Sequence, residues 1–196
     1  MEAFSLQIDN IVGYDVGTST DVDDALTASA KEVLDILPDA MLLKHASTSA
    51  TSSNVLDVEN KRILRVTSVN GFYAKEVPLG LSNQVSDSNS IHFATERTPV
   101  YYIKSSKDLE IKPSEGIVDH IAYPDVINTD SAINQFPDTA EHAVVLSASI
   151  KLLNKKLGSL IVTDEDTELA QTIQGLITST SALYQKEIQR LTGAKS

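Results

Sequence analysis

Among the residues whose types could do chemistry, a run of acids near the N-terminus comes first. Asp21, Asp23 and Asp24 form the Asp-x-Asp pattern that some metal sites use. A calcium-binding EF-hand loop would also need a glycine and a terminal glutamate at fixed offsets, and neither is present here. Acids in the first turn of a helix stabilise it through the helix dipole. We therefore interpret these three acids, and the acidic run at 164–166, as helix-start residues.

Histidines could supply a general base or a metal ligand. The sequence has four of them, at His45, His92, His120 and His142. None is paired at the i, i+4 spacing of a zinc-binding helix. Asp119 and His120 are adjacent in a strand pattern, where neighbours point to opposite faces. Glu141 and His142 are adjacent in a helix pattern, where such neighbours do not face each other. We predict hydrogen-bonding roles for all four.

Nucleophilic and cofactor chemistry also lack their usual motifs. Serine and threonine are plentiful, but no G-x-S-x-G, P-loop or G-x-G-x-x-G sequence occurs. The absence of cysteine excludes thiolate nucleophiles, disulfides and the usual zinc sites. The sequence therefore predicts a protein that is not an enzyme, with no catalytic, cofactor-binding or metal-binding residues. The enzymatic alternative is a small hydrolase that uses Asp119, His120 or His142.

Aromatic residues in the middle of the chain allow a second alternative. Tyr101 and Tyr102, with Phe93 nearby, could stack on bases as the aromatic residues of RNA-binding sheets do. Only five basic residues lie between positions 71 and 112, namely Lys75, Arg97, Lys104, Lys107 and Lys112. We prefer core packing on one face and a subunit contact on the other.

Three helices are predicted around these residues. After a lead over residues 1–17, Thr20 and the following acids start a helix that runs to Leu37 and stops at Pro38. Residues 136–157 form a helix that is apolar almost all round, so it must be buried on several sides; Gly158 should end it. Thr163 should cap a last helix to Leu191. Its apolar seam runs Leu169, Ile173, Leu176 or Ile177, Leu183 or Tyr184, Ile188 and Leu191.

The middle of the chain has the alternation and β-branched residues of strands. Asn70-Gly71 between two such runs predicts a hairpin with a type I′ turn. Further strands are predicted at residues 91–95, 99–105, 108–113 and 116–124. Residues 40–47 are either a strand or a connection, and the small polar run 47–54 is predicted as a loop tip. The fold class is then α+β. A helical bundle, made of an N-terminal helix and two long antiparallel C-terminal helices, carries an inserted, mostly antiparallel β-domain. The predicted division is 1–38, 39–135 and 136–196.

Composition sets limits on partners. The chain has 196 residues, an apolar fraction of 41% and a net charge of −11. Residues 1–60 contain 11 acids and 2 bases, against 16 acids and 14 bases in residues 61–196. Such an acidic surface opposes a DNA grip driven by counterion release, although DNA could still pass as cargo. No apolar run of about 18 residues is present to span a bilayer, and the N-terminus lacks a signal-peptide pattern. We expect a protein made in the cytoplasm, without a membrane partner.

Read as a whole, the chain resembles small virion structural proteins of tailed double-stranded-DNA bacteriophages, in particular head-to-tail connector (adaptor or neck) proteins. Three stretches that cover about a third of the chain bear the likeness: FPDTAEHAVVLSASIKLL, RILRVTSVNGFYAKEVP and NSIHFATERTPVYYIKSSKDLEIKP.

The resemblance implies a homo-oligomeric ring, typically of twelve copies, in the neck of the virion. Such a ring lies beneath the portal protein, joins it to tail or nozzle proteins and lets double-stranded DNA pass. It implies no catalytic residue and no cofactor. Residues 193–196 are too short for the C-terminal arm with which some adaptors grip the portal, so we expect the N-terminal lead or a loop to do so. The alternative is another tail or capsid accessory protein that does not form the connector ring.

Overall fold

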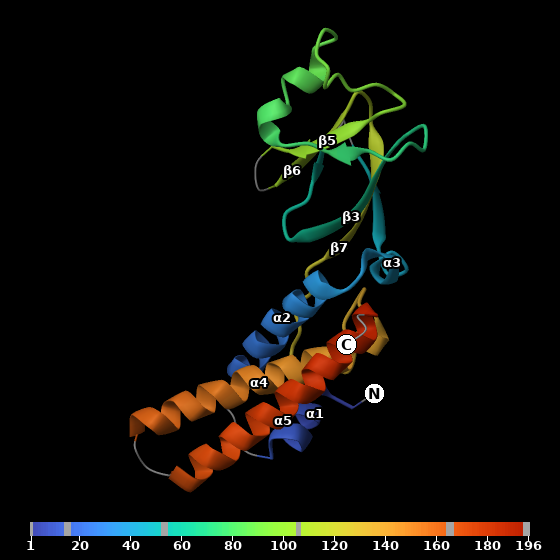
Figure 1. The fold of residues 1–196 in the computed structure, drawn as a ribbon. Coiled ribbons are helices and arrows are strands. Elements are labelled where there is room, and N and C mark those ends of the chain that lie inside the picture. Colours follow the sequence, from blue (N-terminus) through green and yellow to red (C-terminus); the bar gives the residue numbers. More distant parts are fainter. Residues whose placement is uncertain (1, 14–16, 52–54, 105–106, 164–166, 194–196) are drawn as a thin grey trace. The chain divides into compact units, whose positions relative to one another are not determined.

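The chain folds into two compact units, each built around its own core. The computed structural model describes residues 2–13, 17–51, 55–104, 107–163 and 167–193. Met1–Pro38 and Pro124–Ser196 form the helical unit, and Asp39–Tyr123 form the β-unit (Figure 1). Helices with a long C-terminal pair accompany antiparallel and mixed sheets, so the predicted α+β class is confirmed. Residues 124–135, which the sequence-based division joined to the β-domain, belong with the helices.

Helix α4 (Asp138–Thr163) is the centre of the helical unit. It packs against α1 (Phe4–Val12), α2 (Ser19–Ile36) and α5 (Thr167–Thr192). Val144, Ala148 and Leu153 are fully buried, and so is the small Ser149. The prediction that the Ala/Val-rich helix is the buried member of a bundle is confirmed. Small side chains in its middle turns allow neighbouring helices to approach it closely.

The predicted end of this helix was wrong. α4 continues past Gly158 to Thr163, and Gly158 does not have the positive φ of a helix-ending glycine. A glycine inside a helix costs about 0.5–1 kcal/mol relative to alanine, which the packing of such a long helix can offset. Two lysines of α4 pair with α2: Lys151 Nζ lies 2.6 Å from Glu32 and Lys155 Nζ lies 2.5 Å from Asp21.

Helix α5 lies antiparallel to α4, as Figure 1 shows. The buried positions of its seam include Ile173, Ile177 and Leu191, while Tyr184 is half-buried and Leu183 is 55% exposed. The choices that the sequence left open are thus resolved in favour of Ile177 and Tyr184. Thr163 belongs to α4, so it does not cap α5 as predicted, and the acidic run 164–166 lies outside the described residues. Gly193, with φ 68°, follows the end of α5.

The first two helices show how capping sets a helix start. α2 begins at Ser19, two residues before the predicted Asp21, because Thr18 and Asp21 form a reciprocal capping box. α1 was missed, because the sequence pattern offers no capping side chain and no acid in its first turn. Its first N–H groups are instead satisfied by a distant segment, through Phe4 N to Asp130 O at 2.8 Å and Ser5 N to Asn128 O at 3.0 Å.

The β-unit contains two sheets. Its elements are α3 (Asp39–Leu42), β1 (Ser47–Ala50), β2 (Val55–Asp57), β3 (Lys61–Ser68), β4 (Lys75–Glu76), η1 (Leu79–Leu81), η2 (Gln84–Ser86), β5 (Val100–Ile103), β6 (Asp108–Lys112) and β7 (Gly116–Ala122). The first sheet has the order β1-β7-β3 and is antiparallel. The second has the order β2-β6-β5-β4, with β4 parallel to β5. Val66 and Val118 of the first sheet belong to one hydrophobic cluster with Leu109 and Ile111 of the second.

The hairpin at Asn70-Gly71 forms, but not with the predicted turn. Among the described non-glycine residues only Asn60 and Gln135 have positive φ, so Asn70 lacks the conformation that a type I′ turn needs. Ser68 N donates to Phe72 O, and Gly71 takes φ 81°, which is the pattern of a three-residue loop. Pairing with β3 ends soon after the turn, and β4 joins β5 of the second sheet.

Strand predictions at 99–105, 108–113 and 116–124 are confirmed by β5, β6 and β7, whereas three other local predictions were wrong. Residues 91–92 lie in a turn and Thr95 forms only an isolated bridge with Thr98, because Asp87 and Ser90 accept hydrogen bonds from backbone N–H groups two residues on. Residues 47–50, expected in a loop tip, form β1. The hydroxyls of β1 have partners on β7, as in the 2.7 Å bond from Thr48 to Asp119. Residues 52–54 lie outside the described residues. The segment 40–47, predicted as a strand or a connection, instead begins in the short helix α3 and continues through a turn at 43–45.

Candidate functional site

The acids that suggested a metal site have separate structural partners. Asp21 accepts from Thr18 N and pairs with Lys155, and these bonds lower its pKa. Asp23 accepts two hydrogen bonds from Asn128, at 2.6 and 2.9 Å. Asp24 is exposed. Across the described residues, no three carboxylate or imidazole side chains gather as a metal cage would require.

The four histidines lie in four separate parts of the chain. His92 is exposed in a loop, His45 follows α3, and His142 is exposed on α4. His120 is buried on β7, with Nε2 3.2 Å from Ser49 Oγ. Its Nδ1 has no hydrogen-bond partner among the described residues, so no carboxylate orients the ring as a catalytic triad would need. The Ser49–His120 contact joins the paired strands β1 and β7.

Asp119, the neighbour of His120, has its own partners. It accepts from Thr48 and pairs with Arg65 at 2.6 Å. Burial by itself raises the pKa of Asp119, but the bonds from Thr48 and Arg65 outweigh it, and the pKa lies below its usual value. A carboxylate held charged in this way is a poor general base, since it binds a proton weakly. Both members of the Asp119-His120 pair thus stabilise the first sheet.

The aromatic residues do not form a stacking platform. Tyr102 is buried, and Tyr101 donates to Glu76 at 3.2 Å. Burial and the charge of Glu76 raise the pKa of Tyr101 to about 12. Of the neighbouring bases, Lys104 and Lys112 both pair with the buried Glu110, and Lys107 pairs with Glu59. Cations that are already paired offer little to a nucleic-acid phosphate.

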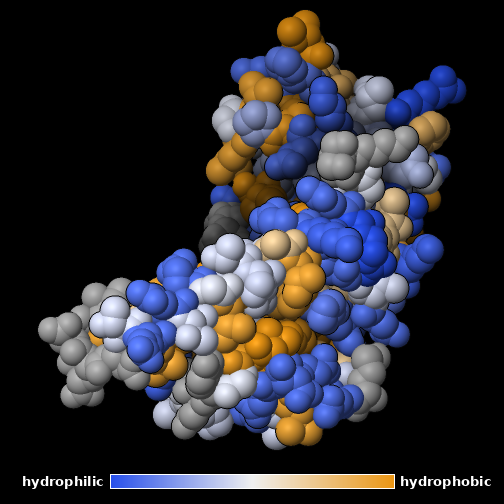
Figure 2. All heavy atoms as spheres, turned by 60° about the horizontal axis from the view of Figure 1, so that its bottom comes forward, coloured by the Kyte–Doolittle hydropathy of each residue, from blue (hydrophilic) through white to orange (hydrophobic). Residues whose placement is uncertain are grey.

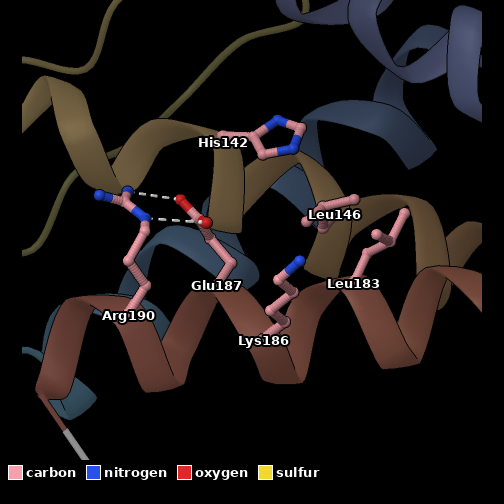
Figure 3. A pocket seen from close by; sticks show the side chains of 6 residues that line it. All are labelled: His142, Leu146, Leu183, Lys186, Glu187 and Arg190. Atoms are coloured by element: carbon pink, nitrogen blue, oxygen red, sulfur yellow. Dashed lines mark hydrogen bonds and ion pairs between the residues drawn. The ribbon is translucent and has the colours of Figure 1, made fainter.

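A groove between α4 and α5 combines apolar and charged side chains (Figure 3). It has a volume of about 310 Å³, and we call it the α4/α5 groove. Its lining residues are His142, Leu146, Leu183, Lys186, Glu187 and Arg190. Leu146 is buried at its floor, whereas Leu183 is 55% exposed. Figure 3 shows the guanidinium of Arg190 facing the carboxylate of Glu187 across two hydrogen bonds.

Three of the groove's residues can be cationic and one is an acid. Arg190 Nη2 donates to Glu187 at 2.6 Å and to the backbone carbonyl of Thr139 at 2.9 Å. The bond from Arg190 lowers the pKa of Glu187, and His142 adds to this effect. Lys186 forms no salt bridge with any described carboxylate. The groove can bind an apolar side chain that is accompanied by negative charge.

The outward side of α5 is uncharged for most of its length. No charged residue occurs between Glu168 and Lys186. Exposed positions on this helix include Gln171, Gln174, Gly175, Thr178, Ala182, Gln185 and Gln189. The hydroxyls of Thr172 and Thr178 donate to carbonyls of their own helix at 2.9 Å. These two hydroxyls would keep their bonds if the face were buried, whereas the exposed glutamines would need hydrogen-bond partners on the other surface.

Charge is divided unequally between the two units. The helical unit contains 17 acids and 7 bases, for a net charge of −10, and the β-unit contains 10 acids and 9 bases, for a net charge of −1. Figure 2 shows a continuous hydrophobic patch on the helical unit, bordered by hydrophilic side chains. An acidic unit thus has a face that is locally free of charge.

Sequence reasoning identified the helices of this surface but missed the groove. The available signal was Leu183 beside Tyr184, since one of two adjacent apolar residues must leave the core seam. None of the described helices is long and apolar enough to cross a bilayer. The sequence matches no protein-family model and no curated protein.

Proposed function

We propose that this protein is a structural virion protein of a tailed bacteriophage. Its copies form a ring adaptor that joins the portal to the tail and lets double-stranded DNA pass through its lumen. The resemblance of three sequence stretches to head-to-tail connector proteins motivates this assignment. The observation that carries it is the uncharged, exposed side of α5 on a unit of net charge −10.

Electrostatics supports self-association through that side. Two copies of a strongly acidic unit repel each other wherever their charged faces meet. Contact through an uncharged helix face avoids this repulsion, and the self-satisfied hydroxyls of Thr172 and Thr178 reduce the cost of removing water. The acidic faces of the unit are then available to line the lumen, where they would keep DNA phosphates from binding.

The β-unit supports a contact with a different protein. Ala50, Ile117, Thr67 and Tyr73 are successive cross-strand neighbours in one row of the first sheet. Ile117 is 39% exposed and Tyr73 is 71% exposed, so this row presents apolar surface to solvent. Exposed aromatic and aliphatic residues of this kind are common in protein interfaces. The proposal assigns this row to contact with the portal or with tail or nozzle proteins.

Electron cryomicroscopy of intact particles tests the proposal directly. We expect a closed ring of this protein on the tail axis, between portal and tail, with about twelve copies as the resemblance implies. Density for the protein elsewhere in the particle would favour the accessory-protein alternative. The proposal fails if no particle contains such a ring and if the purified protein stays monomeric with portal protein present.

A further inference from the structure

The exposed large apolar residues of the helical unit differ in the charge of their surroundings. The four in its described part are Leu6 (50% exposed), Ile36 (45%), Ile127 (51%) and Leu183 (55%). Leu183 lies among the cations of the α4/α5 groove. Ile127 lies between Asp125 and Asp130 in the sequence, in a segment that we call the acidic turn (residues 125–130).

We propose that the α4/α5 groove of one copy binds the acidic turn of a second copy of this chain, with Ile127 against Leu183. This inference rests on the proposed function and adds a charged contact beside the uncharged side of α5, which the groove borders through Leu183.

The groove is built to receive an apolar side chain accompanied by carboxylates. Leu146 and Leu183 supply apolar surface in a space of about 310 Å³. Lys186 has no salt bridge with a described carboxylate, although acids outnumber bases by 17 to 7 in this unit. Because Arg190 already neutralises Glu187, the remaining charge of the groove is positive. It therefore attracts a negatively charged segment.

The acidic turn presents such a segment in a fixed shape. Ile127 N donates to Asp130 Oδ2 at 3.0 Å, and Asp130 N donates to Ile127 O at 3.0 Å. Val126 N donates to Thr27 Oγ1 at 2.9 Å, which attaches the turn to α2. Asp125 lies 3.5 Å from Lys31 Nζ, but its side chain is 90% exposed and so stays accessible to a second cation. A turn held in place by these bonds loses little conformational entropy on binding.

The start of α1 adds to the same acidic and apolar character. Ser5 N and Phe4 N donate to the carbonyls of Asn128 and Asp130, so α1 begins against the turn. Leu6 is half-exposed and Asp9 is exposed on this helix.

The two surfaces lie on different sides of α4, which suits a head-to-tail contact. Glu141 accepts from Ile133 N at 2.7 Å and so holds the segment that contains the turn, whereas His142 lines the groove. Successive residues of a helix point about 100° apart. A contact that joins two different surfaces repeats from copy to copy and closes into a ring when the rotation allows.

Two charged substitutions and their mixture test this contact. Leu183→Glu puts negative charge in the groove while leaving the turn intact, and Ile127→Lys puts positive charge on the turn while leaving the groove intact. Self-association is measured by sedimentation velocity and native mass spectrometry over a concentration series, with thermal melting to verify folding. We expect each variant to associate at least about tenfold more weakly than the natural protein, equivalent to about 1.4 kcal/mol.

The equimolar mixture is the decisive arm. The intact turn of the Leu183→Glu chain can enter the intact groove of the Ile127→Lys chain. The mixture should therefore form heterodimers at concentrations where each variant alone stays monomeric. Ile36→Glu is the matched control, since Ile36 is 45% exposed on the same unit but outside both surfaces. It should associate as the natural protein does.

The failures of this inference and of the proposed function are distinguishable. If either variant associates like the natural protein, or if the mixture yields no heterodimer, the contact is wrong even where particles contain the ring. If the natural protein stays monomeric at every concentration, the contact is also wrong, and particle imaging decides the adaptor proposal separately. A photo-crosslinker at position 183 that reacts with a peptide other than the acidic turn of a second copy would overturn the contact as well.

Discussion

The helical unit and the β-unit handle charge in opposite ways. In the β-unit, buried carboxylates are paired: Glu110 lies between Lys104 and Lys112, and Asp119 bonds Arg65 and Thr48. In the helical unit, the buried Glu141 bonds Ile133 N through Oε1, and its Oε2 has no partner among the described residues. The β-unit balances its charge internally, to a net of −1, while the helical unit keeps a net of −10. The comparison indicates that the helical unit's excess charge is available to act outside the unit.

The largest expected effect concerns the two separate cores. Leu153→Ala in α4 and Leu109→Ala in β6 each remove a fully buried side chain, so each should cost about 2–5 kcal/mol. If the units unfold independently, hydrogen exchange should rise mainly in the unit that carries the substitution. Equal loss of protection in both units after either substitution would show that they unfold as one cooperative body.

A matched pair of glycine substitutions should change the free energy of unfolding in opposite directions in the two units. A Cβ at Gly116 would collide with the backbone carbonyl of Thr67 and lie 2.7 Å from Ile111, so Gly116→Ala should destabilise the β-unit by about 2 kcal/mol. A Cβ at Gly158 meets nothing within 4 Å on α4, so Gly158→Ala should stabilise the helical unit by about 0.5–1 kcal/mol. Denaturant unfolding curves measure both. A stabilising Gly116→Ala would contradict the close approach of β7 to β3.

Acidification should change the stability contributions of the paired Glu110 and the incompletely paired Glu141 in opposite directions. Burial raises the pKa of Glu110, but bonds from Lys104 and Lys112 outweigh it and leave the pKa below its usual value. Its stabilisation is therefore present above the unfolded-state pKa and is lost as pH falls toward the lower folded-state pKa. Burial raises the pKa of Glu141, so its charged form destabilises the fold at neutral pH, and this cost disappears as pH falls through the folded-state pKa into acid.

Glutamine variants measure these contributions. At pH 7 we expect Glu110→Gln to cost about 2 kcal/mol and Glu141→Gln to stabilise the protein by about 1 kcal/mol. Both differences should shrink in acid, where the natural side chains become protonated. Urea unfolding from pH 7 down to pH 3 provides the test, and a Glu141→Gln variant that is less stable than the natural protein at pH 7 would contradict the unpaired state of Oε2.

The smallest expected effect distinguishes the observed cap of α2 from the predicted one. Thr18→Ala removes the hydroxyl that accepts from Asp21 N and should cost about 1 kcal/mol. Thr20→Ala is the control, because Thr20 lies inside the first turn and should cost less. Thermal melting compares the two. Equal costs would mean that the capping box contributes no more than helix propensity.

Local patterns were reliable where a segment's own residues satisfy its backbone. The strands at 100–103, 108–112 and 116–122 and the buried α4 follow from alternation and apolar content. Local patterns failed where a backbone group or side chain finds its hydrogen-bond partner in a distant segment of the chain. α1 begins against Asn128 and Asp130, and β1 is a strand because its hydroxyls find Asp119 and His120. Conversely, Asp87 and Ser90 bond nearby backbone and convert a strand-like stretch into turns.

The candidate site was less predictable than the fold. The uncharged run of α5 can be read directly from the chain, and the Leu183–Tyr184 pair signals one apolar side chain too many for a single seam. The α4/α5 groove needs two helices in register, and the acidic turn needs Thr27, Asn128 and Asp130 brought together. The spacing of residues within one segment determines neither the register of two helices nor the contacts between distant segments.

By itself the sequence determined the α+β class, the central buried helix, the absence of cysteine chemistry and the acid excess, because composition and periodicity act within one segment. Only the tertiary structure decided which of two adjacent apolar residues left the core, where the 124–135 segment belongs, and which carboxylates are paired. Those outcomes depend on packing and hydrogen bonds between residues as far apart as Thr27 and Val126. Such contacts form only when the whole unit closes around its core.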